Sequence, residues 1–573
     1  MSRARSLIAL CALVLTVLVV PGPARADNPI VQTVYTADPA PLVHDGRVYL
    51  YTGRDEDSST YFTMKEWRVW SSADMVNWTD HGSPLNLASF SWASDNAWAG
   101  QAVERNGKFY WYVPMKVRAT GRMAIGVAVA DSPTGPFRDA LGRPLADTNE
   151  IDPSVFIDDD GQAYLYWGNP NLWYVKLNPD MISFSGSPAK IPLTTAGFGT
   201  RTGDANRPTL YEEGPWVYKR GGLYYLVYAA KCCSEFIAYS TAPGPLGPWT
   251  YRGTVMPTQG SSFTNHPGLI DFAGSSYFFY HNGALPGGGG YTRSVAVEKF
   301  SYRSDGTIPS ITMTTAGAPQ VGTLDPYTRQ EAETIATESG VETEALTAGG
   351  RSVSFIDNGD WIKIKGVAFG TGAASFTARV ASATSGGRIE LRLGSSTGTL
   401  AGTCTVPGTG GWQAFADVTC PVTASGTQDL YLRFTGGSGS LFNVDRWQFT
   451  RAGSTTPPPT TPPPTTPPPT TPPPTGAGCT AALRVTSTWN GGFQAEVTVT
   501  AGAAAVTGWR VGWTLASGQS VSQVWNGSLT TSGSNVTVGN ASYNGSLAPG
   551  ASTTFGLLAT GSPATPALSC ATA

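Results

Sequence analysis

Charge is scarce in this sequence. Only 13% of the 573 residues are Asp, Glu, Lys or Arg, there are 4 histidines, and the formal net charge is -3. No block of basic residues occurs, which argues against a nucleic-acid partner. Apolar residues at helical spacing are almost absent too, whereas short aromatic and β-branched runs bounded by Gly, Asn and Asp recur. The sequence therefore predicts an all-β chain that does not bind nucleic acid.

Long apolar runs are also few. One extends from Leu7 to Val20, which is too short to span a membrane, and no later run approaches the required length. Two arginines precede this run, and the small-residue site Ala24-Arg25-Ala26 follows it, as in a secretory signal. We expect residues 1–26 to be a signal peptide and the mature chain to be secreted and extracellular, with no membrane partner.

Cysteine is rare, with 7 residues in the chain. Cys11 lies in the expected signal, so six cysteines remain in an oxidising compartment. The adjacent Cys232 and Cys233 are compatible with a strained vicinal disulfide or with two buried thiols. None of the cysteines has the spacing of metal ligands. The simplest pairing of the others by domain is Cys404 with Cys420 and Cys479 with Cys570.

Two segments divide the chain. Residues 452–478 contain a repeat of Pro and Thr that cannot form helix or sheet, and we expect an extended linker there. Residues 313–326 are rich in small and turn residues and are predicted to be a short linker. The parts between these boundaries are 27–312, 327–451 and 479–573. Their 17 Trp, 23 Tyr and 22 Phe suit a protein that stacks rings on sugars.

Residues 27–312 contain an internal repeat of five segments. Each has a start residue, an apolar stretch, a turn with glycine and an aromatic strand, as in "DPAPLVHDGRVYLYTG" and "HPGLIDFAGSSYFFYHN". Successive start residues lie 61, 53, 61 and 53 positions apart. Five β units of this size predict a five-bladed β-propeller, with the start residues at one level around the central channel. These residues are Asp38, Ala99, Asp152, Glu213 and His266.

Burying three carboxylates and a histidine around one axis costs free energy unless these groups are solvated, form ion pairs or take part in catalysis. Glycoside hydrolysis uses two carboxylates that flank a bond, one protonated and one ionised. A third acidic group raises the pKa of a neighbour and keeps it protonated near neutral pH. An Asp before Pro is by itself most often a turn residue. The shared register of these residues in the repeat is what favours catalysis.

Residues 27–312 resemble glycoside hydrolase family 43 through "TADPAP", "IDPSVF", "YEEGPW" and "TNHPGL". The resemblance implies a five-bladed propeller that hydrolyses glycosidic bonds with inversion. It also implies that Asp38 is the general base that activates water. Asp152 would be the residue that tunes the pKa of the acid and orients it, and Glu213 would be the general acid.

The resemblance assigns weaker roles to two further residues. His266 matches the family's axial histidine, which often lies near a bound cation, so a metal in the propeller channel is possible. Arg293, in "YTRSVAVE", matches an arginine that contacts substrate. A strand-ending arginine is more often only a solvated charge. Trp98 and Trp92 are candidates for lining the sugar site, although a propeller tryptophan is at least as often part of the core.

Within the family, "YTGRDED" and "WAGQAVERNGKFYWYVP" resemble the arabinoxylan arabinofuranohydrolases, which remove L-arabinofuranose from xylan. The same carboxylates serve β-xylosidases, arabinanases and endo-xylanases, so these activities remain alternatives. A catalytically silent, lectin-like binder is another alternative, against which the intact carboxylates weigh. We expect no cofactor for the chemistry, and we expect a monomer.

Residues 327–451 resemble carbohydrate-binding module family 6, a β-sandwich, through "QEAET", "FIDNGDWIKI" and "GSLFNVDRWQF". Glu331 and Glu333 would project to one face of a strand and, with Asp445, supply hard oxygen ligands for a structural calcium ion. The alternative is a solvated acidic strand. The positions that match sugar-binding residues of that family, two aromatics that sandwich a ring and an asparagine, are Phe355, Trp412 and Asn443.

Residues 479–573 resemble carbohydrate-binding module family 2, another β-sandwich, through "WNGGFQ", "GWRVGWTL", "VWNGSL" and "ASYNGSLAPG". Cellulose-binding members of that family present three coplanar aromatics on a flat face, and Trp509 and Trp513 are more suited to the core. The expected polysaccharide partners of the whole chain are therefore arabinoxylan or xylan and cellulose. The residues that match the three coplanar aromatics are Trp489, Trp525 and Tyr543.

Overall fold

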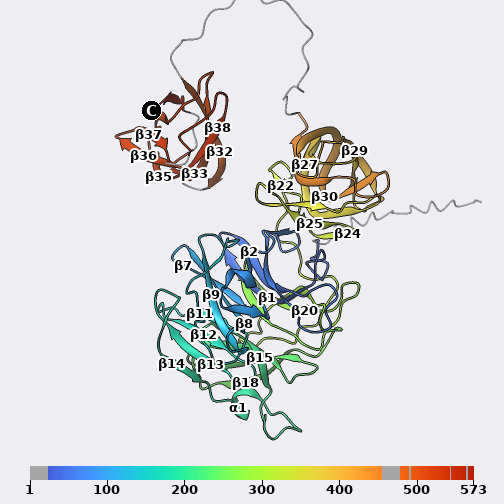
Figure 1. Cartoon of the computed structure of the whole chain (residues 1–573), viewed down its shortest axis with the longest axis vertical. Helices are drawn as coiled ribbons and strands as arrows, with labels where there is room; N and C mark the ends of the chain where they lie inside the picture. The colour runs from blue at the N-terminus through green and yellow to red at the C-terminus, as the bar shows by residue number, and fades with distance from the viewer. Residues whose placement is uncertain (1–23, 454–477, 490–491, 542–543, 563–565, 573) are drawn as a thin grey trace, which may run out of the picture. The chain divides into compact units, whose positions relative to one another are not determined.

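The computed structural model describes residues 24–453 and, between 478 and 572, all residues except 490–491, 542–543 and 563–565 (Figure 1). The chain divides into two compact units, Met1–Thr456 and Pro457–Ala573. Apart from the single turns η1 (Leu87–Ser89) and α1 (Thr195–Phe198), the described residues form strands and loops. None of the helices among them is long and apolar enough to cross a membrane. The prediction of an all-β chain is confirmed.

Residues 36–300 form five antiparallel sheets that follow one another along the chain. The first sheet contains β1 (Thr36–His44), β2 (Arg47–Arg54), β3 (Glu66–Ser72), β4 (Trp78–Asp80) and β5 (Leu85–Asn86). The second contains β6 (Ala93–Asp95), β7 (Gln101–Arg105), β8 (Lys108–Val117), β9 (Met123–Ala130) and β10 (Arg138–Asp139). The third contains β11 (Ser154–Ile157), β12 (Ala163–Trp167), β13 (Trp173–Leu177) and β14 (Phe184–Lys190). The fourth contains β15 (Tyr211–Arg220), β16 (Leu223–Ala230), β17 (Phe236–Ala242) and β18 (Thr250–Met256). The fifth contains β19 (Gly268–Phe272), β20 (Ser275–Asn282) and β21 (Ser294–Phe300).

The five sheets are arranged as a β-propeller. Strand β7 lies against β1 and β11, β15 lies against β11, and β19 returns to β1. Each predicted repeat segment supplies one of these five strands. Asp38 and Glu213 lie within their strands, whereas Ala99, Asp152 and His266 each precede theirs by two residues. The repeat register that the sequence predicted is therefore present in the fold.

The N-terminal segment closes the ring. The Ile30 N–H donates to the Val295 carbonyl at 3.0 Å, and the Thr36 N–H donates to the Arg293 carbonyl at 2.9 Å. These bonds satisfy backbone groups along the edge of the fifth sheet that would otherwise be left unpaired. The first and last sheets are thereby joined, which keeps residues from both ends of the propeller sequence in place at its centre.

The second part of the same unit is a β-sandwich directly joined to the propeller. Its strand β23 (Thr334–Ile335) pairs with β4 and so extends the first propeller sheet. Its other strands are β22 (Gln330–Glu331), β24 (Thr337–Ser339), β25 (Glu342–Ala345), β26 (Arg351–Ser354), β27 (Trp361–Ala381), β28 (Gly387–Leu393), β29 (Thr399–Val406), β30 (Ala416–Gly436) and β31 (Asn443–Arg451).

The predicted short linker, residues 313–326, is packed between these two parts. The Ala26 N–H donates to the Ala318 carbonyl at 2.8 Å, and the Val321 N–H donates to the Asp74 carbonyl at 2.9 Å. Asn77 joins the same region to the sandwich, because its amide exchanges hydrogen bonds of 2.8 and 2.9 Å with the backbone of Lys365. The segment therefore connects the propeller and the sandwich through specific contacts.

The second unit is a sandwich of two four-stranded sheets around its own core. Trp509 and Trp513 are buried in that core, as predicted. One sheet contains β32 (Cys479–Trp489), β33 (Gly492–Ala501), β38 (Ser552–Thr560) and β35 (Ser520–Trp525). The other contains β36 (Gly527–Ser532), β37 (Asn535–Asn540), β34 (Trp509–Thr514) and β39 (Ser569–Thr572).

Disulfides join Cys404 to Cys420 and Cys479 to Cys570, which confirms the pairing by domain. A disulfide also joins the neighbouring Cys232 and Cys233, so the vicinal alternative holds in this structure.

Candidate active site

All five start residues of the repeat line one cavity of about 270 Å³. Such a volume is at the small end of the range for ligand pockets. Each of the five sheets contributes to the walls, so the cavity lies where the sheets converge. The residues that line it are Asp38, Tyr61, Phe62, Trp98, Ala99, Ile151, Asp152, Asn169, Glu213, Cys232, Cys233, Phe263, Thr264, His266 and Arg293.

Irregular backbone aims the carboxylates into the cavity. Asp38 and Asp152 adopt the left-handed region, with φ of 56° and 60°, which Asp tolerates better than most residues. Strand β1 has a register shift between Ala37 and Ala40, and β15 has shifts on both sides of Glu213. Bulges of this kind occur next to active sites because they redirect a side chain.

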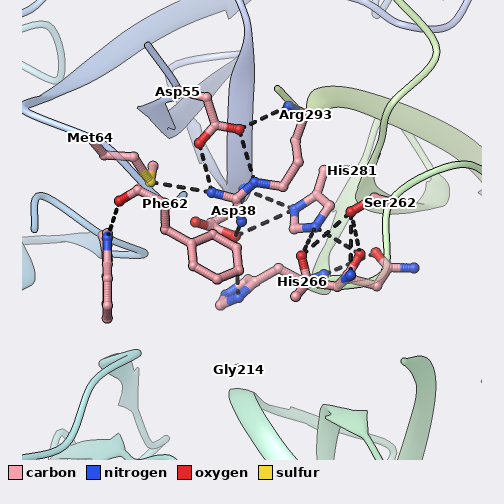
Figure 2. A network of polar contacts seen from close by, with 12 residues as sticks. Asp38, Asp55, Phe62, Met64, Gly214, Ser262, His266, His281 and Arg293 are labelled. Atoms are coloured by element: carbon pink, nitrogen blue, oxygen red, sulfur yellow. Dashed lines mark hydrogen bonds and ion pairs between the residues drawn. The ribbon is translucent and has the colours of Figure 1, made fainter. Parts of the chain in front are cut away.

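A buried arginine organises one side of the cavity (Figure 2). The Arg293 guanidinium donates to Asp55 through Nε at 2.9 Å and through Nη2 at 2.8 Å, and its Nη1 donates to Asp38 at 3.1 Å. Arg293 is only 4% exposed. The sequence predicted a substrate contact for this side chain or a solvated charge. The structure places it in the cavity wall, with its guanidinium bound to two carboxylates.

Asp38 is held as a carboxylate. Its burial acts to raise its pKa, but the charge of Arg293 and a hydrogen bond with His281 outweigh burial and hold that pKa well below its usual value. His281 Nδ1 accepts from the Asp38 N–H at 3.2 Å, and His281 Nε2 lies 3.0 Å from the Thr264 carbonyl. Asp38 is therefore ionised over the whole neutral and mildly acidic range.

Glu213 and Asp152 show the opposite behaviour. Burial, followed by the charges of Asp38 and Glu212, raises the pKa of Glu213 to about 7. Burial and the charges of Glu213 and Asp38 raise the pKa of Asp152 well above its usual value, although Asp152 accepts the Gly214 N–H at 3.0 Å. The pair thus retains a proton near neutral pH, beside a carboxylate that does not. This is the division into acid and base that glycoside hydrolysis requires.

The two adjacent glutamates of β15 point to different environments. Glu213 lines the cavity and accepts a hydrogen bond from the Asn169 amide. Glu212 is 3% exposed and bound to two arginines, Arg201 and, at 2.7 Å, Arg207. The glutamate that lines the cavity is therefore Glu213, whereas Glu212 is bound to the two arginines.

His266 lies beside Asp38, with its Nδ1 3.9 Å from Asp38 Oδ1. Burial lowers the pKa of His266 to about 4, so its ring is neutral near pH 7. Gly214 is needed at this point, because a Cβ there would lie 3.0 Å from His266 Nδ1 and the backbone has a φ of 59°. A neutral imidazole can bind a cation or a water molecule. A metal at His266 stays a prediction.

Aromatic side chains form another part of the wall. Trp98 lines the cavity as predicted, and its Nε1 donates to the Phe62 carbonyl at 2.9 Å. Phe62 also packs against the Arg293 guanidinium, whose carbon is 5.2 Å from the ring centre. Tyr61 lines the cavity and is 56% exposed. Trp92, the other candidate, instead packs against Phe90 of the core.

The sequence analysis missed several of these residues. Asp55 and His281 lie at the ends of β2 and β20, outside the start positions of the repeat, and Asn169 is in the loop after β12. Tyr61 and Phe62 belong to a loop without any repeated pattern. The adjacent aromatics of "TYFTM" were the available signal for that loop, and "GRDED" was the available signal for Asp55.

The family 6-like module brings two of its three predicted binding residues together. The buried Asn443 amide donates to the Trp412 carbonyl at 3.1 Å and to Glu344 at 2.7 Å. Phe355 follows β26 and is 55% exposed, with a left-handed φ of 57°. An exposed aromatic in this sparsely populated conformation is a mark of a functional surface.

Two of the three residues predicted to bind calcium are paired with arginines. Glu331 is bound to Arg329 at 2.9 Å, and Asp445 is bound to Arg446 at 2.9 Å. Glu333 is buried, and its Oε2 has no hydrogen-bond partner in the described part of the chain. Across the residues that the structure describes, no group of three or more His, Cys, Asp or Glu side chains is arranged to hold a metal ion. The orphaned Glu333 oxygen is nevertheless the type of donor that calcium prefers.

In the second unit, Trp525 lies half-buried in β35, opposite Gly556 of β38. A Cβ at Gly556 would lie 2.1 Å from the Trp525 ring, so the indole covers the glycine closely. The side chain of Trp489 and the whole of Tyr543 lie outside the described residues. The predicted row of three aromatics is therefore described only at Trp525.

Three family models match the chain. A model described as glycosyl hydrolases family 43 matches residues 26–308, one described as carbohydrate binding module (family 6) matches 331–451, and one described as cellulose binding domain matches 479–572.

Two curated relatives extend beyond a single domain. An arabinoxylan arabinofuranohydrolase of Bacillus subtilis (strain 168) is 36% identical over 499 residues, 74% of this chain and 92% of the relative. Another of that name, from Paenibacillus polymyxa, is 36% identical over 493 residues, 74% of each chain.

A solved structure is similar as well. It is a family 43 arabinoxylan arabinofuranohydrolase from Bacillus subtilis in complex with cellotetraose, with a TM-score of 0.65 and 34% identity, and the match covers 75% of this chain and 99% of that one. Both the sequence and the geometry of the cavity agree with these matches. The chain belongs to glycoside hydrolase family 43, with carbohydrate-binding modules of family 6 and of the cellulose-binding type.

Proposed function

We propose that the chain is a secreted, inverting glycoside hydrolase that removes α-L-arabinofuranosyl side groups from arabinoxylan. The observation that carries this proposal is the cavity in which Asp38 is held ionised while Asp152 and Glu213 retain a proton. The small volume of the cavity, about 270 Å³, favours a single side-chain sugar over a long stretch of main chain. The names of the two curated relatives point to the same substrate.

In this mechanism, the bond between the anomeric carbon and the glycosidic oxygen breaks as water attacks from the opposite face. Glu213 gives its proton to the leaving oxygen, and Asp38 takes a proton from the attacking water. Arg293 keeps Asp38 ionised for that step. Asp152, which accepts the Gly214 N–H, fixes the backbone beside Glu213 and so orients the acid.

The two modules would hold the enzyme on its substrate. The exposed Phe355 and Trp412 are proposed to bind xylan, and the row that includes Trp525 is proposed to bind cellulose. Attachment through several modules raises the concentration of the catalytic cavity near the plant cell wall. The signal-like segment at residues 1–26 supports export to that location.

The released sugar tests the proposal. Incubation of the full chain with wheat arabinoxylan, xylo-oligosaccharides and linear arabinan should release arabinose from arabinoxylan and no xylose. A Glu213→Gln variant should release arabinose about a thousandfold more slowly, which excludes contaminating activity. Xylose or short xylo-oligomers from the wild type would instead establish a β-xylosidase or endo-xylanase. The absence of any sugar from all three substrates would indicate a non-catalytic binder.

The adjacent glutamates provide a matched pair of variants. Glu213→Gln should lower kcat about a thousandfold, because a general acid contributes roughly 10²–10⁴ to a rate. Glu212→Gln should lower kcat less than tenfold but reduce the melting temperature, since it leaves Arg201 and Arg207 without their buried partner. Steady-state kinetics and thermal melting of both variants check this. Equal losses of kcat would contradict the assignment of Glu213 as the acid.

The pH profile has a predicted shape. Activity should fall as the pH rises through about 7, because Glu213 loses its proton there. Activity should persist well below pH 5, because the pKa of Asp38 is held far below its usual value and the base stays ionised. In Asp152→Asn the basic limb should stay near pH 7, because the raised pKa of Asp152 keeps it protonated where Glu213 titrates and no negative charge is removed. A limb that moves down in this variant would contradict this order of ionisation.

We also propose a structural calcium ion in the family 6-like module. Burial and the nearby charges of Glu331, Asp80 and Asp445 raise the pKa of Glu333 well above its usual value, and a cation would relieve that repulsion and bind the free Oε2. Glu331 and Asp445 would have to turn from their arginines.

Thermal melting tests for this ion. The melting temperature of the full chain should rise by several degrees in 1 mM calcium relative to EGTA, as expected for a ligand that binds only the folded state, at roughly millimolar or tighter affinity. Glu333→Gln should abolish the rise, whereas Glu390→Gln, which alters a carboxylate bound to Arg392 in the same module, should retain it. A melting temperature that does not respond to calcium in the wild type would argue against this ion.

A further inference from the structure

The three disulfides of the structure lie in different surroundings. Cys404 and Cys420 are buried in the core of the family 6-like module, and Cys479 is buried in the core of the second unit. In contrast, Cys233 is exposed and Cys232 is half-buried, and both line the cavity that contains Glu213. Of the three disulfides, this one lines the space where a substrate would bind.

Its position in the sequence argues against a stabilising role. A disulfide stabilises a fold mainly by closing a loop in the unfolded chain, and the effect grows with loop length. Cys479 and Cys570 are 91 positions apart, and Cys404 and Cys420 are 16 apart. Cys232 and Cys233 are neighbours, so their bond encloses no intervening residue. If the disulfide does not stabilise the fold, its role must come from the surface that it adds to the cavity wall.

The loop that carries the disulfide is tied to the catalytic machinery on both sides. On one side the Cys232 N–H donates at 2.9 Å to Glu212, which is itself fixed by two arginines. On the other side the Glu235 carboxylate accepts the Asn265 N–H at 2.8 Å, and the Glu235 N–H donates to the Phe263 carbonyl at 2.9 Å. These bonds fix the sulfur atoms relative to Glu213 and to the loop that leads to His266.

The cavity walls differ in chemistry from sheet to sheet. Loops of the first, second and fifth sheets supply the aromatic rings, namely Tyr61, Phe62, Trp98 and Phe263. The third and fourth sheets supply Asp152, Asn169 and Glu213, which are polar, and their apolar surface consists of Ile151 and the disulfide. The acid therefore stands on the side of the cavity where an apolar contact for a sugar ring is scarcest.

We propose that the Cys232–Cys233 disulfide is the apolar surface against which the sugar residue held beside Glu213 packs. A sugar ring has faces of C–H groups and an edge of hydroxyl groups, so it needs apolar contact as well as hydrogen bonds. A disulfide carries no N–H or O–H and does not ionise, and sulfur is polarizable. Two free thiols would instead add weak donors and titratable groups at this surface.

Reduction would change this surface without changing the sequence. A dithiol reductant gives two electrons and two protons to the disulfide, the S–S bond breaks, and two thiols form while the reductant becomes a cyclic disulfide. Each thiol can then rotate about its own Cα–Cβ bond. The packing surface is lost, whereas Asp38, Asp152 and Glu213 are untouched.

The proposal rests on the proposed function only in that a sugar enters this cavity; it does not depend on which pentose enters. The test uses an aryl glycoside of whichever sugar the wild type releases, with the free sugar as a competitive inhibitor. The proteins are the wild type, C232S/C233S, and C404S/C420S, which lacks a disulfide distant from the cavity. Each is assayed with and without dithiothreitol.

We expect C232S/C233S to raise KM and the inhibition constant about tenfold, with a smaller effect on kcat and an unchanged basic limb of the pH profile. Reductant should produce the same change in the wild type and in C404S/C420S, and no further change in C232S/C233S. The reductant experiment on folded wild type stands even where the double variant folds poorly.

Unchanged KM and inhibition constants in both the reduced wild type and C232S/C233S would overturn the proposal. A shifted basic limb would overturn it too, because it would assign the disulfide to proton transfer. Where the wild type releases xylose, the same comparison on the aryl xyloside applies. Where no sugar is released, calorimetric titration of the wild type and C232S/C233S with arabinose and xylose replaces the kinetic comparison. Equal affinities of the two proteins for both sugars would contradict the proposal.

Discussion

The ion pair of Arg293 with Asp55 and Asp38 is the interaction on which the catalytic cavity depends. Three carboxylates face one small space, and without a compensating charge their mutual repulsion and their burial would favour the protonated form of all three. Arg293 lies 3.1 Å from Asp38 and satisfies only that member of the group. One carboxylate is thereby stabilised as an anion, and the two others retain raised pKa values. The division of roles follows from where Arg293 is placed.

Asp55 is what keeps that cation in place. Asp55 is fully buried and accepts two hydrogen bonds from the Arg293 guanidinium. It also accepts a third, of 2.8 Å, from the Arg293 backbone N–H. A buried arginine with only Asp38 as its partner would be free to follow the substrate or to turn toward Glu213. The two-point contact with Asp55 fixes the direction of Nη1, in keeping with the planar geometry of arginine and carboxylate pairs. Asp55 comes from the first sheet and Arg293 from the last, so this contact also depends on closure of the ring.

The sequence allowed the propeller and its five convergent residues to be predicted because they recur in a repeat. Asp38, Ala99, Asp152, Glu213 and His266 occupy one register, and the equivalent strands bring them to one cavity. Asp55 does not belong to this repeated register. It lies after the end of a strand, whereas the start residues of the repeat lie before or within theirs, and its partner Arg293 is 238 residues away in the sequence. Local patterns do not report contacts of that kind.

The remaining differences have similar causes. Arg293 looked like a solvated charge or a substrate contact because its burial depends on both ends of the propeller sequence. The calcium site stays a prediction, because alternation along one strand does not account for the arginines that bind Glu331 and Asp445. The disulfide between Cys232 and Cys233 was one of two alternatives, because adjacency in the sequence is equally compatible with two free thiols.

The first sheet also joins the propeller to the family 6-like module. Its outer strand β4 pairs with β23 of the family 6-like module, and Arg351 of that module lies 3.2 Å from Asp80 of β4. The charges of Arg68 and Arg351 outweigh the burial of Asp80 and lower its pKa, so this contact between propeller and module is ionic. Arg351 begins β26, and the exposed Phe355 directly follows the end of the same short strand. The residue that fixes the module to the propeller is thus four positions from the aromatic that faces solvent. Because β1 of the same sheet carries Asp38, the carboxylate proposed as the base and the aromatic proposed to bind xylan belong to one compact unit.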